Sequence, residues 1–421
     1  MTRAEVRTGG HGLTPRERPA LRHGDGFTEP APRATFADEL ERLPLAELLT
    51  VAESAGASRV EAALRTNPLE RTLEDFAALL SPAAAARVED LATASHRLTV
   101  SRFGRTMRMY APLYLSNECL TTCAYCGFAR ELPIARKTLT PDETLAEARH
   151  LLHQGFRSIL LLTGEHERLT GVGFLEDRIR LLAREVPQLS IEVQVWSEEE
   201  YRRLAEAGCE GVVIYQETYH PETYAKVHLA GRKRHERWRL LGPERAARAG
   251  MRRIGIGALS GLHDDWRYEA ICVAAHARFL QRHYWRSQVS VSVPRMRPSA
   301  AGFQPTTLLS DRELVQLVCA LRLALPDAGL VLSARERPEL RDGLFRIGIT
   351  HTSAGSHTEP GGYEQPREAT EQFEVADLRS PPEVAETLRA LGYDPVWEDW
   401  ARVTPSAELM LSRDLIEAAP R

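Results

Sequence analysis

The stretch Asn117-Glu118-Cys119-Leu120-Thr121-Thr122-Cys123-Ala124-Tyr125-Cys126-Gly127-Phe128 contains three of the chain's six cysteines. Their spacing is C-x3-C-x2-C, and Tyr125 stands directly before the third cysteine. Three thiolates this close together suit a soft metal centre. Such a loop can supply three of the four ligands of a [4Fe-4S] cluster and leave one iron open, whereas electron-carrying clusters normally have four cysteine ligands. The motif therefore predicts a cluster bound by Cys119, Cys123 and Cys126, with one iron available to another molecule.

Two other interpretations of the cysteines compete with this one. A structural zinc site needs four nitrogen or sulfur ligands, and no nearby histidine or fourth cysteine completes such a set. The cysteines could also be clustered by chance. The remaining ones, Cys209, Cys272 and Cys319, are scattered among apolar or small residues, as ordinary core cysteines are. The close spacing favours the iron-sulfur centre.

Composition limits the classes of protein that need to be considered. The 421 residues are enough for one barrel of about 250 residues with additional segments. The net charge of -4 gives no strong field toward nucleic acid or membrane. No apolar run approaches the roughly 18 residues of a membrane span, and no signal peptide opens the chain. We expect a cytoplasmic protein, because unpaired cysteines suit a reducing compartment, with neither nucleic acid nor membrane as a partner.

Apolar runs of strand length recur along the chain, on both sides of the cysteine loop. They cover residues 107–115, 158–162, 191–196, 211–215, 253–259, 288–293, 329–333 and 347–353. Eight runs is the number that a (β/α)8 barrel needs. An open doubly wound sheet would also satisfy the right-handed crossover rule, but the strand count favours the barrel.

The segments between these runs have helix start and stop signals. Capping boxes begin at Thr140, Ser197, Ser310 and Ser380, where a hydroxyl and a carboxylate three residues later satisfy free backbone amides. Gly155, Gly208, Gly250 and Gly392 stand where left-handed helix ends are expected. We therefore predict an α/β fold, a TIM-type (β/α)8 barrel with a helical N-terminal lead-in and a C-terminal extension.

Four regions follow from this pattern. Residues 1–35 are rich in Pro, Gly and Arg and are predicted to be disordered. Residues 36–104 form the helical lead-in, and residues 105–355 form the barrel. Residues 356–421 form an extension that is expected to pack on the barrel.

Polar residues at the carboxyl ends of barrel strands are the first candidates for chemistry. Thr163-Gly164-Glu165-His166 follows the second run, and Tyr215-Gln216-Glu217-Thr218-Tyr219-His220 ends the fourth. The run 191–196 would place Glu192 and Gln194 inside the barrel, which is costly unless they meet a ligand or each other. For each of these groups, a solvated loop is the plain alternative.

Three arginines follow the sixth and seventh runs: Arg295, Arg297 and Arg335. A guanidinium at a barrel mouth suits bidentate binding of a carboxylate. The alternative for Arg335 is a structural salt bridge with Glu336 or Glu339.

Taken together, these motifs resemble the aromatic amino acid lyases of the radical S-adenosylmethionine (SAM) superfamily, and within them the tyrosine lyases of thiamin thiazole synthesis. The resemblance extends from about Leu79 to Trp400. The matching motifs are residues 112–117, the cysteine loop, and residues 136–139, 163–166, 215–220, 261–262, 295–298, 335–336, 360–363 and 396–400.

The resemblance implies that a [4Fe-4S] cluster binds SAM and generates a 5'-deoxyadenosyl radical, which cleaves the Cα–Cβ bond of L-tyrosine. The expected products are 2-iminoacetate, p-cresol, 5'-deoxyadenosine and methionine. By the same resemblance, Arg335 binds the substrate carboxylate. The expected catalytic residues are Tyr114, Arg297, Arg335 and Ser353, and the expected SAM-binding residues are Tyr125, Gly164, Glu165, Gln194, Gln216 and Glu217.

Related activities remain as alternatives. The tyrosine lyase of hydrogenase maturation has a second, C-terminal cluster, whereas this chain has no cysteine after Cys319. A tryptophan lyase that makes 3-methyl-2-indolic acid shares residues 261–265 and 293–298 as they stand here. A non-catalytic iron-sulfur protein would bind a cluster without consuming SAM.

Partners also follow from the resemblance. A reduced flavodoxin or ferredoxin is expected as the electron donor, and a thiazole synthase is expected to receive the imine, which hydrolyses readily in water. Basic residues flank the cysteine loop in sequence and could attract an acidic electron donor: Arg102, Arg105, Arg108, Arg130, Arg136 and Lys137. A scatter of solvated charges is the alternative.

Overall fold

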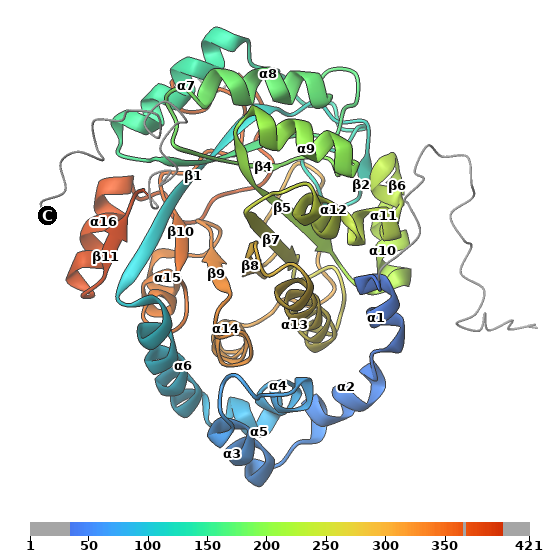
Figure 1. Ribbon diagram of the computed structural model, residues 1–421, viewed down its shortest axis with the longest axis vertical. Helices are drawn as coiled ribbons and strands as arrows, with labels where there is room; N and C mark the ends of the chain where they lie inside the picture. The colour runs from blue at the N-terminus through green and yellow to red at the C-terminus, as the bar shows by residue number, and fades with distance from the viewer. Residues whose placement is uncertain (1–33, 365–367, 399–421) are drawn as a thin grey trace, which may run out of the picture. The chain divides into compact units, whose positions relative to one another are not determined.

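A computed structural model describes residues 34–364 and 368–398. Eight parallel strands run in the order β1-β3-β4-β5-β7-β8-β9-β10, and β10 pairs with β1 to close a barrel (Figure 1). These strands are β1 (Thr106–Ser116), β3 (Ser158–Thr163), β4 (Gln188–Glu192), β5 (Cys209–Glu217), β7 (Arg253–Ala258), β8 (Gln288–Ser292), β9 (Gly329–Leu332) and β10 (His351–Ser353). Every predicted run overlaps one of them, so the predicted TIM-type barrel is confirmed.

Helices surround the barrel and occupy the lead-in. The lead-in contains α1 (Phe36–Arg42), α2 (Leu45–Ser54), α3 (Ala57–Arg65), α4 (Leu73–Leu79), α5 (Pro82–Ala85) and α6 (Val88–Phe103). The others are α7 (Pro141–His153), α8 (Val172–Leu182), α9 (Glu198–Ala207), α10 (Pro221–Val227), α11 (Glu236–Leu240), α12 (Gly242–Arg248), α13 (Trp266–His283), α14 (Asp311–Ala324), α15 (Pro338–Phe345) and α16 (Pro381–Ala390), with a 3-10 turn at Arg232–Arg234.

Local side-chain chemistry sets the ends of several helices as predicted. All four expected capping boxes are present, at Thr140, Ser197, Ser310 and Ser380. Gly208 ends α9 in the left-handed region with φ 116°, where a Cβ would be strained. These caps fix where each helix begins and ends, and therefore how long the loops at the barrel mouths are.

The structure differs from the sequence prediction at β4. We expected a strand over residues 191–196, but β4 ends at Glu192. Its last pairings are Leu162 with Glu192 and Ile191 with Val212, beyond which neither neighbour continues the ladder. Gln194 is buried in the loop that follows rather than in the strand.

Three short strands were not predicted. β2 (Thr122–Cys123) lies inside the cysteine loop and pairs antiparallel with β6 (His228–Ala230). β11 (Asp394–Val396), in the C-terminal extension, pairs in parallel with the first residues of β1. All three are too short to give a periodic signal in the sequence.

The lead-in packs against the outer helices α13 and α14 (Figure 1). The ring of Phe36 stacks on His276 of α13 with centroids 4.0 Å apart. The buried amide of Gln316, on α14, donates to the carbonyls of Leu79 and Ser81 at 3.0 and 2.9 Å. Buried hydrogen bonds of this kind satisfy helix-end carbonyls.

Side chains of β1 alternate between the two sides of the barrel wall. Met107, Met109 and Ala111 are buried on one side, and Tyr110 and Tyr114 line the interior on the other. Within the described residues, no helix is both long and apolar enough to cross a membrane. The predicted segment 1–35, apart from its last two residues, and the end of the extension from residue 399 lie outside the described residues.

Candidate active site

The cysteine loop leaves the carboxyl end of β1 and is held on both sides. The amide of Leu120 donates to the carbonyl of Glu165, after β3, at 2.8 Å, and that of Ala124 donates to Val227 at 2.9 Å. The β2–β6 pairing adds a third anchor. Gly231 follows β6 with φ 82°, and a Cβ there would lie 2.6 Å from Thr121. A glycine is therefore required at position 231, because a larger residue there would clash with Thr121 of the cysteine loop.

The three thiols lie close together within this loop. The Sγ atoms of Cys119 and Cys123 are 2.9 and 3.8 Å from the same hydroxyl, that of Thr121. The Sγ of Cys126 accepts hydrogen bonds from the Phe128 amide at 3.4 Å and from Gln372 Nε2 at 3.7 Å. Amide donors directed at sulfur are typical of iron-sulfur sites.

The surroundings of the thiols fit a multi-iron cluster. Burial, together with the neighbouring thiols, raises the pKa of Cys123 and Cys126, so thiolates here need a positive charge beside them. Among residues 34–364 and 368–398, no three His, Cys, Asp or Glu side chains converge closely enough to hold one metal ion. Three thiols in one loop are the ligand set that a four-iron cluster with one open iron would take.

The other three cysteines are core residues. Cys209, Cys272 and Cys319 are buried in β5, α13 and α14, and burial raises the pKa of each thiol. This agrees with the interpretation drawn from their apolar surroundings in the sequence. The cysteine loop therefore offers three thiols, which is the number that leaves one iron of a four-iron cluster open.

A segment of the C-terminal extension lies against the cysteine loop. We call residues 368–376 the strap. The amide of Thr370 donates to Ala135 at 3.1 Å, and that of Glu374 donates to Pro298 at 3.0 Å. A Cβ on Gly127 would lie 2.4 Å from the carbonyl oxygen of Gln372. No periodic pattern in the sequence predicts this segment, because its position depends on contacts with residues far away along the chain.

Four charged residues form an ion-pair network next to the cysteine loop. Glu165 pairs with Arg239 at 3.1 Å, and Glu217 pairs with Lys233 at 2.7 Å and with Arg239 at 3.8 Å. Burial opposes ionisation of Glu217, but Lys233 and Arg239 outweigh it and hold the pKa below its usual value. Glu217 also has φ 70°, the only positive φ among the described non-glycine residues. Such strain is concentrated at functional sites.

The remaining residues expected to bind SAM lie near this network or are buried without partners. The hydroxyl of Tyr125 lies 2.9 Å from Nε2 of His228. A Cβ on Gly164 would lie 2.2 Å from the carbonyl oxygen of Glu118. In the described part of the chain, the buried side-chain amides of Gln194 and Gln216 have no hydrogen-bond partner. Unpaired buried amides are costly, so a polar ligand would stabilise both.

A separate cavity lies at the carboxyl end of the barrel interior. Its lining includes three of the four predicted catalytic residues, Tyr114, Arg335 and Ser353. It also includes Tyr110, Pro112, Leu160, Leu162, Glu192, Tyr215, Ser333, Thr358, Gln372 and Phe373. The hydroxyl of Tyr114 donates to Oε1 of Gln372 at 2.7 Å, so the strap forms part of this cavity.

Arg335 has no salt-bridge partner among the described residues. Its guanidinium lies over the ring of Phe373, 3.4 Å from the centroid. Glu336 pairs with Arg295, and Glu339 pairs with Arg337. The alternative of a structural salt bridge for Arg335 is therefore wrong, and the guanidinium is available to a ligand in the cavity.

The sequence pattern predicted that Glu192 lies inside the barrel but predicted no role for it. Its carboxylate lines the same cavity as Arg335. Burial, and then the charge of Glu217, raise its pKa to about 7, while Arg335 acts in the opposite direction. The alternation of polar and apolar residues over 191–196 was the sequence pattern that indicated an inward-facing Glu192.

Arg297 does not line this cavity. Its neighbour Met296 packs with Cys123 and Tyr125 of the cysteine loop. The buried Nε of Arg297 has no hydrogen-bond partner in the described chain. Its catalytic role remains a prediction.

The fold and the cysteine loop define a class, and sequence comparison agrees with it. The Radical SAM superfamily profile matches residues 113–271, and the Biotin and Thiamin Synthesis associated domain matches residues 292–394. The chain is 44% identical to the 2-iminoacetate synthase of Escherichia coli (strain K12) over 366 residues, which are 87% of this chain and 97% of that protein. The Salmonella typhimurium 2-iminoacetate synthase is 43% identical over the same fractions. The chain therefore belongs to the 2-iminoacetate synthase family of radical SAM enzymes.

Solved structures of related proteins have the same fold. A crystal structure of HydG, a maturase of the [FeFe]-hydrogenase, superposes with a TM-score of 0.79 at 29% identity, covering 86% of this chain and 81% of HydG. HydG from Carboxydothermus hydrogenoformans gives 0.74 at 31% identity, covering 87% and 83%. The higher identity to the 2-iminoacetate synthases places the chain with them.

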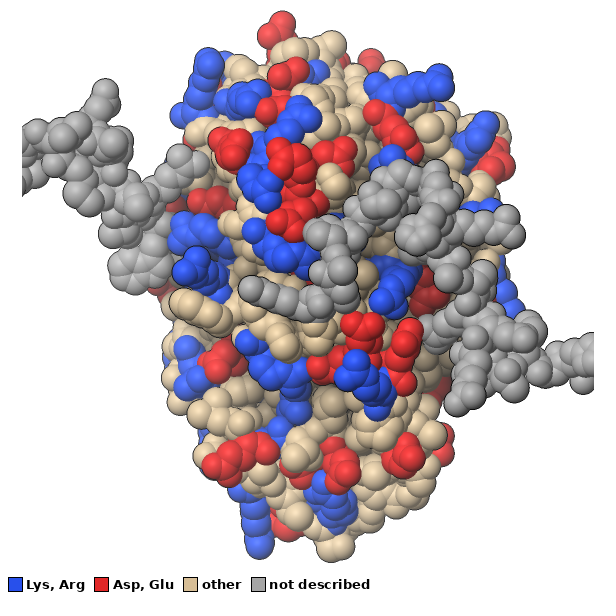
Figure 2. Space-filling view, turned by 45° about the vertical axis from the view of Figure 1, so that its right-hand side comes forward, with Lys and Arg blue, Asp and Glu red and all other residues tan. Residues whose placement is uncertain are grey.

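The expected basic surface for an electron donor is only partly supported. Arg102 lies in the last turn of α6 and Arg108 near the start of β1, whereas the cysteine loop follows the end of β1. The eleven residues of β1, at about 3.3 Å each, separate its two ends. Arg136 donates to the carbonyls of Asn117 and Ala129, and Lys137 pairs with Glu143. The face in Figure 2 shows acidic and basic side chains interspersed. That some of these six residues dock an acidic electron donor stays a prediction.

Proposed function

We propose that the cavity lined by Tyr114, Glu192 and Arg335 binds L-tyrosine and that the Cα–Cβ bond is cleaved there. As a member of the 2-iminoacetate synthase family, the protein is a radical SAM carbon–carbon lyase. Its products are 2-iminoacetate, for thiamin thiazole synthesis, and p-cresol, with SAM converted to 5'-deoxyadenosine and methionine.

The guanidinium of Arg335 is the observation that supports this assignment most. It is unpaired in the described chain, lines the cavity and is stacked on Phe373. Stacking fixes the plane of the guanidinium, so its two N–H edges can meet both oxygens of an amino acid carboxylate.

The charge pattern of the cavity complements an amino acid. Arg335 and Glu192 present opposite charges to one enclosed space, as the α-carboxylate and α-ammonium of a zwitterion require. Tyr114 and Ser353 line the same space and supply hydroxyl groups that can hydrogen-bond the substrate. A ligand that satisfies both charges is bound more strongly than one that leaves either unpaired.

We assign the cluster ligands to Cys119, Cys123 and Cys126. The residues assigned to SAM are Tyr125, Gly164, Glu165, Gln194, Gln216 and Glu217. When bound, the cluster and SAM supply the 5'-deoxyadenosyl radical that starts the reaction. The chain's own part is to hold both cofactors and the substrate in one enclosed space, with Gln194 and Gln216 offering their unpaired amides.

The strap supports this assignment because it links the two binding regions. Gln372 donates to the sulfur of Cys126 and accepts from the hydroxyl of Tyr114. One side chain therefore contacts both the cluster loop and the substrate cavity. Covering the site excludes water, which protects reactive species and strengthens the charge interactions inside.

The test is an anaerobic assay of the reconstituted, dithionite-reduced protein with SAM and either tyrosine or tryptophan. We expect p-cresol and 5'-deoxyadenosine with tyrosine. Indolic products from tryptophan would favour the tryptophan lyase alternative instead. Absence of deoxyadenosine with both amino acids would mean a non-catalytic iron-sulfur protein.

The partners and location are also part of the proposal. A flavodoxin or ferredoxin in the cytoplasm would reduce the cluster, and a thiazole synthase would receive the imine. Reduction by flavodoxin in place of dithionite tests the first partner, and strong salt dependence of its rate would indicate charge-assisted docking.

A further inference from the structure

The half of the barrel interior nearest the strand N-termini is unusually poor in large side chains. TIM barrels normally fill their interior with layers of bulky branched residues and have no pore. Here the inward positions of that half include several serines and glycines: Ser158, Ser190, Gly211, Gly255, Ser290, Ser292 and Gly329. Side chains this small leave space between larger lining residues such as Val213, Val331 and His351.

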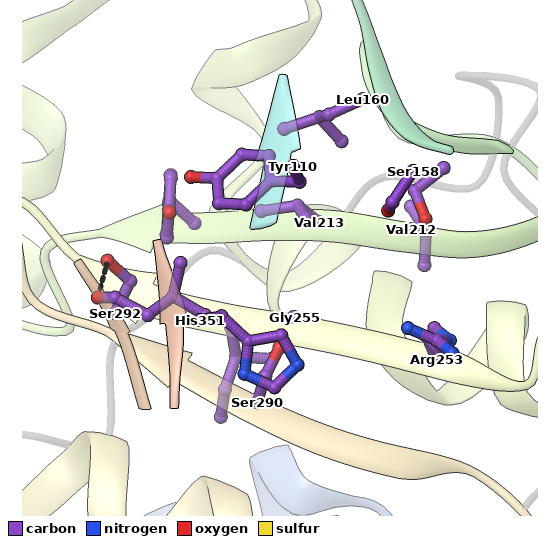
Figure 3. A pocket seen from close by; sticks show the side chains of 14 residues that line it. Tyr110, Ser158, Leu160, Val212, Val213, Arg253, Gly255, Ser290, Ser292 and His351 are labelled. Atoms are coloured by element: carbon purple, nitrogen blue, oxygen red, sulfur yellow. Dashed lines mark hydrogen bonds between the residues drawn. The ribbon is translucent and has the colours of Figure 1, made fainter. Parts of the chain in front are cut away.

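Three cavities follow one another along the barrel. The amino acid cavity shares the lining residues Tyr110, Leu160 and Tyr215 with a second cavity below it. Figure 3 shows this second cavity, where side chains from several strands point toward one space. The second cavity shares Arg253, Ser290 and His351 with a third cavity. The shared lining residues place the three cavities next to one another, and we infer that they connect into one passage.

The third cavity lies at the amino end of the barrel. Its lining includes Arg108, near the start of β1, and Gln288, the first residue of β8. Trp285, also in the lining, is 76% exposed. The passage therefore leads from the amino acid cavity to the face opposite the cysteine loop.

The passage is polar enough for a small hydrophilic molecule. Serine hydroxyls occur along its wall, and the hydroxyl of Ser292 donates to the carbonyl of Val331 at 3.1 Å. Arg253 and His351 stand where the second and third cavities meet. Hydroxyl groups along the wall, and the guanidinium charge of Arg253 at the wider end, favour a small carboxylate over an aromatic molecule.

We propose that this passage along the barrel axis conducts 2-iminoacetate from the amino acid cavity to the mouth beside Trp285. The inference rests on the proposed function, which supplies the product. At the other end, the strap and the cofactor sites cover the cavity, so a second opening lets the smallest product leave separately from p-cresol and 5'-deoxyadenosine. The molecule moves without a covalent change.

Ser290 is the position at which to close the passage, since it lines both the second and the third cavity. Ser290→Phe places a ring across the axis, and Ser290→Ala is the matched control that keeps it open. Val331→Phe closes the second cavity from the neighbouring strand. None of these residues belongs to the proposed cofactor or substrate sites.

The assay separates chemistry from release. Anaerobic holoenzyme is supplied with SAM, tyrosine and reductant, p-cresol is quantified after quenching, and glyoxylate, the hydrolysis product of released 2-iminoacetate, is followed in solution with a coupled dehydrogenase. We expect both Phe variants to form first-turnover p-cresol as wild type does, and to release glyoxylate at least fivefold more slowly. Ser290→Ala should match wild type in both.

Glyoxylate release that keeps pace with p-cresol in both Phe variants would overturn the passage and leave the lyase function intact. A wild-type protein that forms no p-cresol would overturn the proposed function, and with it the molecule assigned to the passage. If the Phe variants do not fold, wild-type crystals soaked with glyoxylate decide. Glyoxylate between Tyr110 and Ser290 is expected, and its absence along the axis would overturn the proposal.

Discussion

The two halves of the barrel interior have the same strands and opposite contents. Toward the strand C-termini, aromatic rings and charged groups surround the amino acid cavity, including Tyr114, Glu192 and Arg335. Toward the N-termini, hydroxyls and glycine backbone leave space, as at Ser190, Gly255 and Ser290. The difference shows that a closed barrel does not need a filled core along its whole axis, because the outer helices bury the other face of every strand.

The largest effect is expected from a substitution that removes a proposed cluster ligand at the C-terminal half of the barrel. Cys123→Ala should abolish 5'-deoxyadenosine formation, because the cluster loses one of its three thiolates. Iron content and the visible absorption of the reconstituted protein measure the loss. Cys209→Ala, at the start of β5, is the control and should keep its iron; equal iron in both variants would contradict the assignment of the cluster ligands.

Arg335→Ala should have the next largest effect, on the affinity for tyrosine. Leaving the substrate carboxylate without its partner is expected to weaken tyrosine binding by roughly 2–5 kcal/mol. The apparent tyrosine affinity of the anaerobic holoenzyme measures this. Arg337→Ala, whose side chain pairs with Asp311 and Glu339, should leave affinity unchanged. Unaltered tyrosine affinity in Arg335→Ala would remove the carboxylate assignment.

Glu192→Gln should have a smaller and pH-dependent effect. Above pH 7 the variant loses a charge-assisted hydrogen bond to the substrate ammonium, at roughly 1.5–3 kcal/mol. Wild-type tyrosine affinity should rise with pH through about 7, the pKa of Glu192, and the variant should lack that rise. A matching pH profile in the two proteins would show that another group titrates.

The same residue predicts how stability depends on pH. The pKa of Glu192 is raised from 4.5 to about 7 in the folded protein, so between these values the folded chain keeps a proton that the unfolded chain has lost. This contribution to stability therefore falls as pH rises through that window. Denaturant titrations of Glu192→Gln should lack this fall, and the variant should be more stable than wild type above pH 7.

Ser190→Ala should have the smallest effect. Its side chain lines the open half, and removing one hydroxyl there should change the free energy of unfolding by less than about 0.5 kcal/mol. Ile191→Ala is the matched control, because Ile191 is fully buried on the other face of β4, and should cost about 2–5 kcal/mol. A large loss in Ser190→Ala would mean that the open half is tightly packed after all.

Much of the fold could be predicted because its signals are local. A capping box such as that at Ser197 and a left-handed glycine such as Gly208 depend on a few neighbouring residues. The end of β4 could not be predicted, since it depends on where the adjacent strands stop pairing. Alternating polar and apolar residues continue past that point in the sequence without any partner strand.

The site was predictable to the extent that strand ends place residues together. Tyr114, Arg335 and Ser353 line one cavity because β1, β9 and β10 end at the same mouth. The contribution of Gln372 and the ion pairs of Arg239 depend on loop paths that no periodicity encodes. Arg297 shows the converse, since it follows a strand of the barrel as predicted and yet does not line this cavity.

The strap has a consequence for how iron reaches the protein. The cysteine loop precedes residues 368–376 in the order of synthesis, so it is accessible to an iron-sulfur donor before its cover exists. Once Thr370 and Glu374 have formed their backbone hydrogen bonds, a donor must wait for this segment to detach. For the proposed cluster, loading during synthesis would meet no cover, whereas reloading of the finished protein would require the strap to detach.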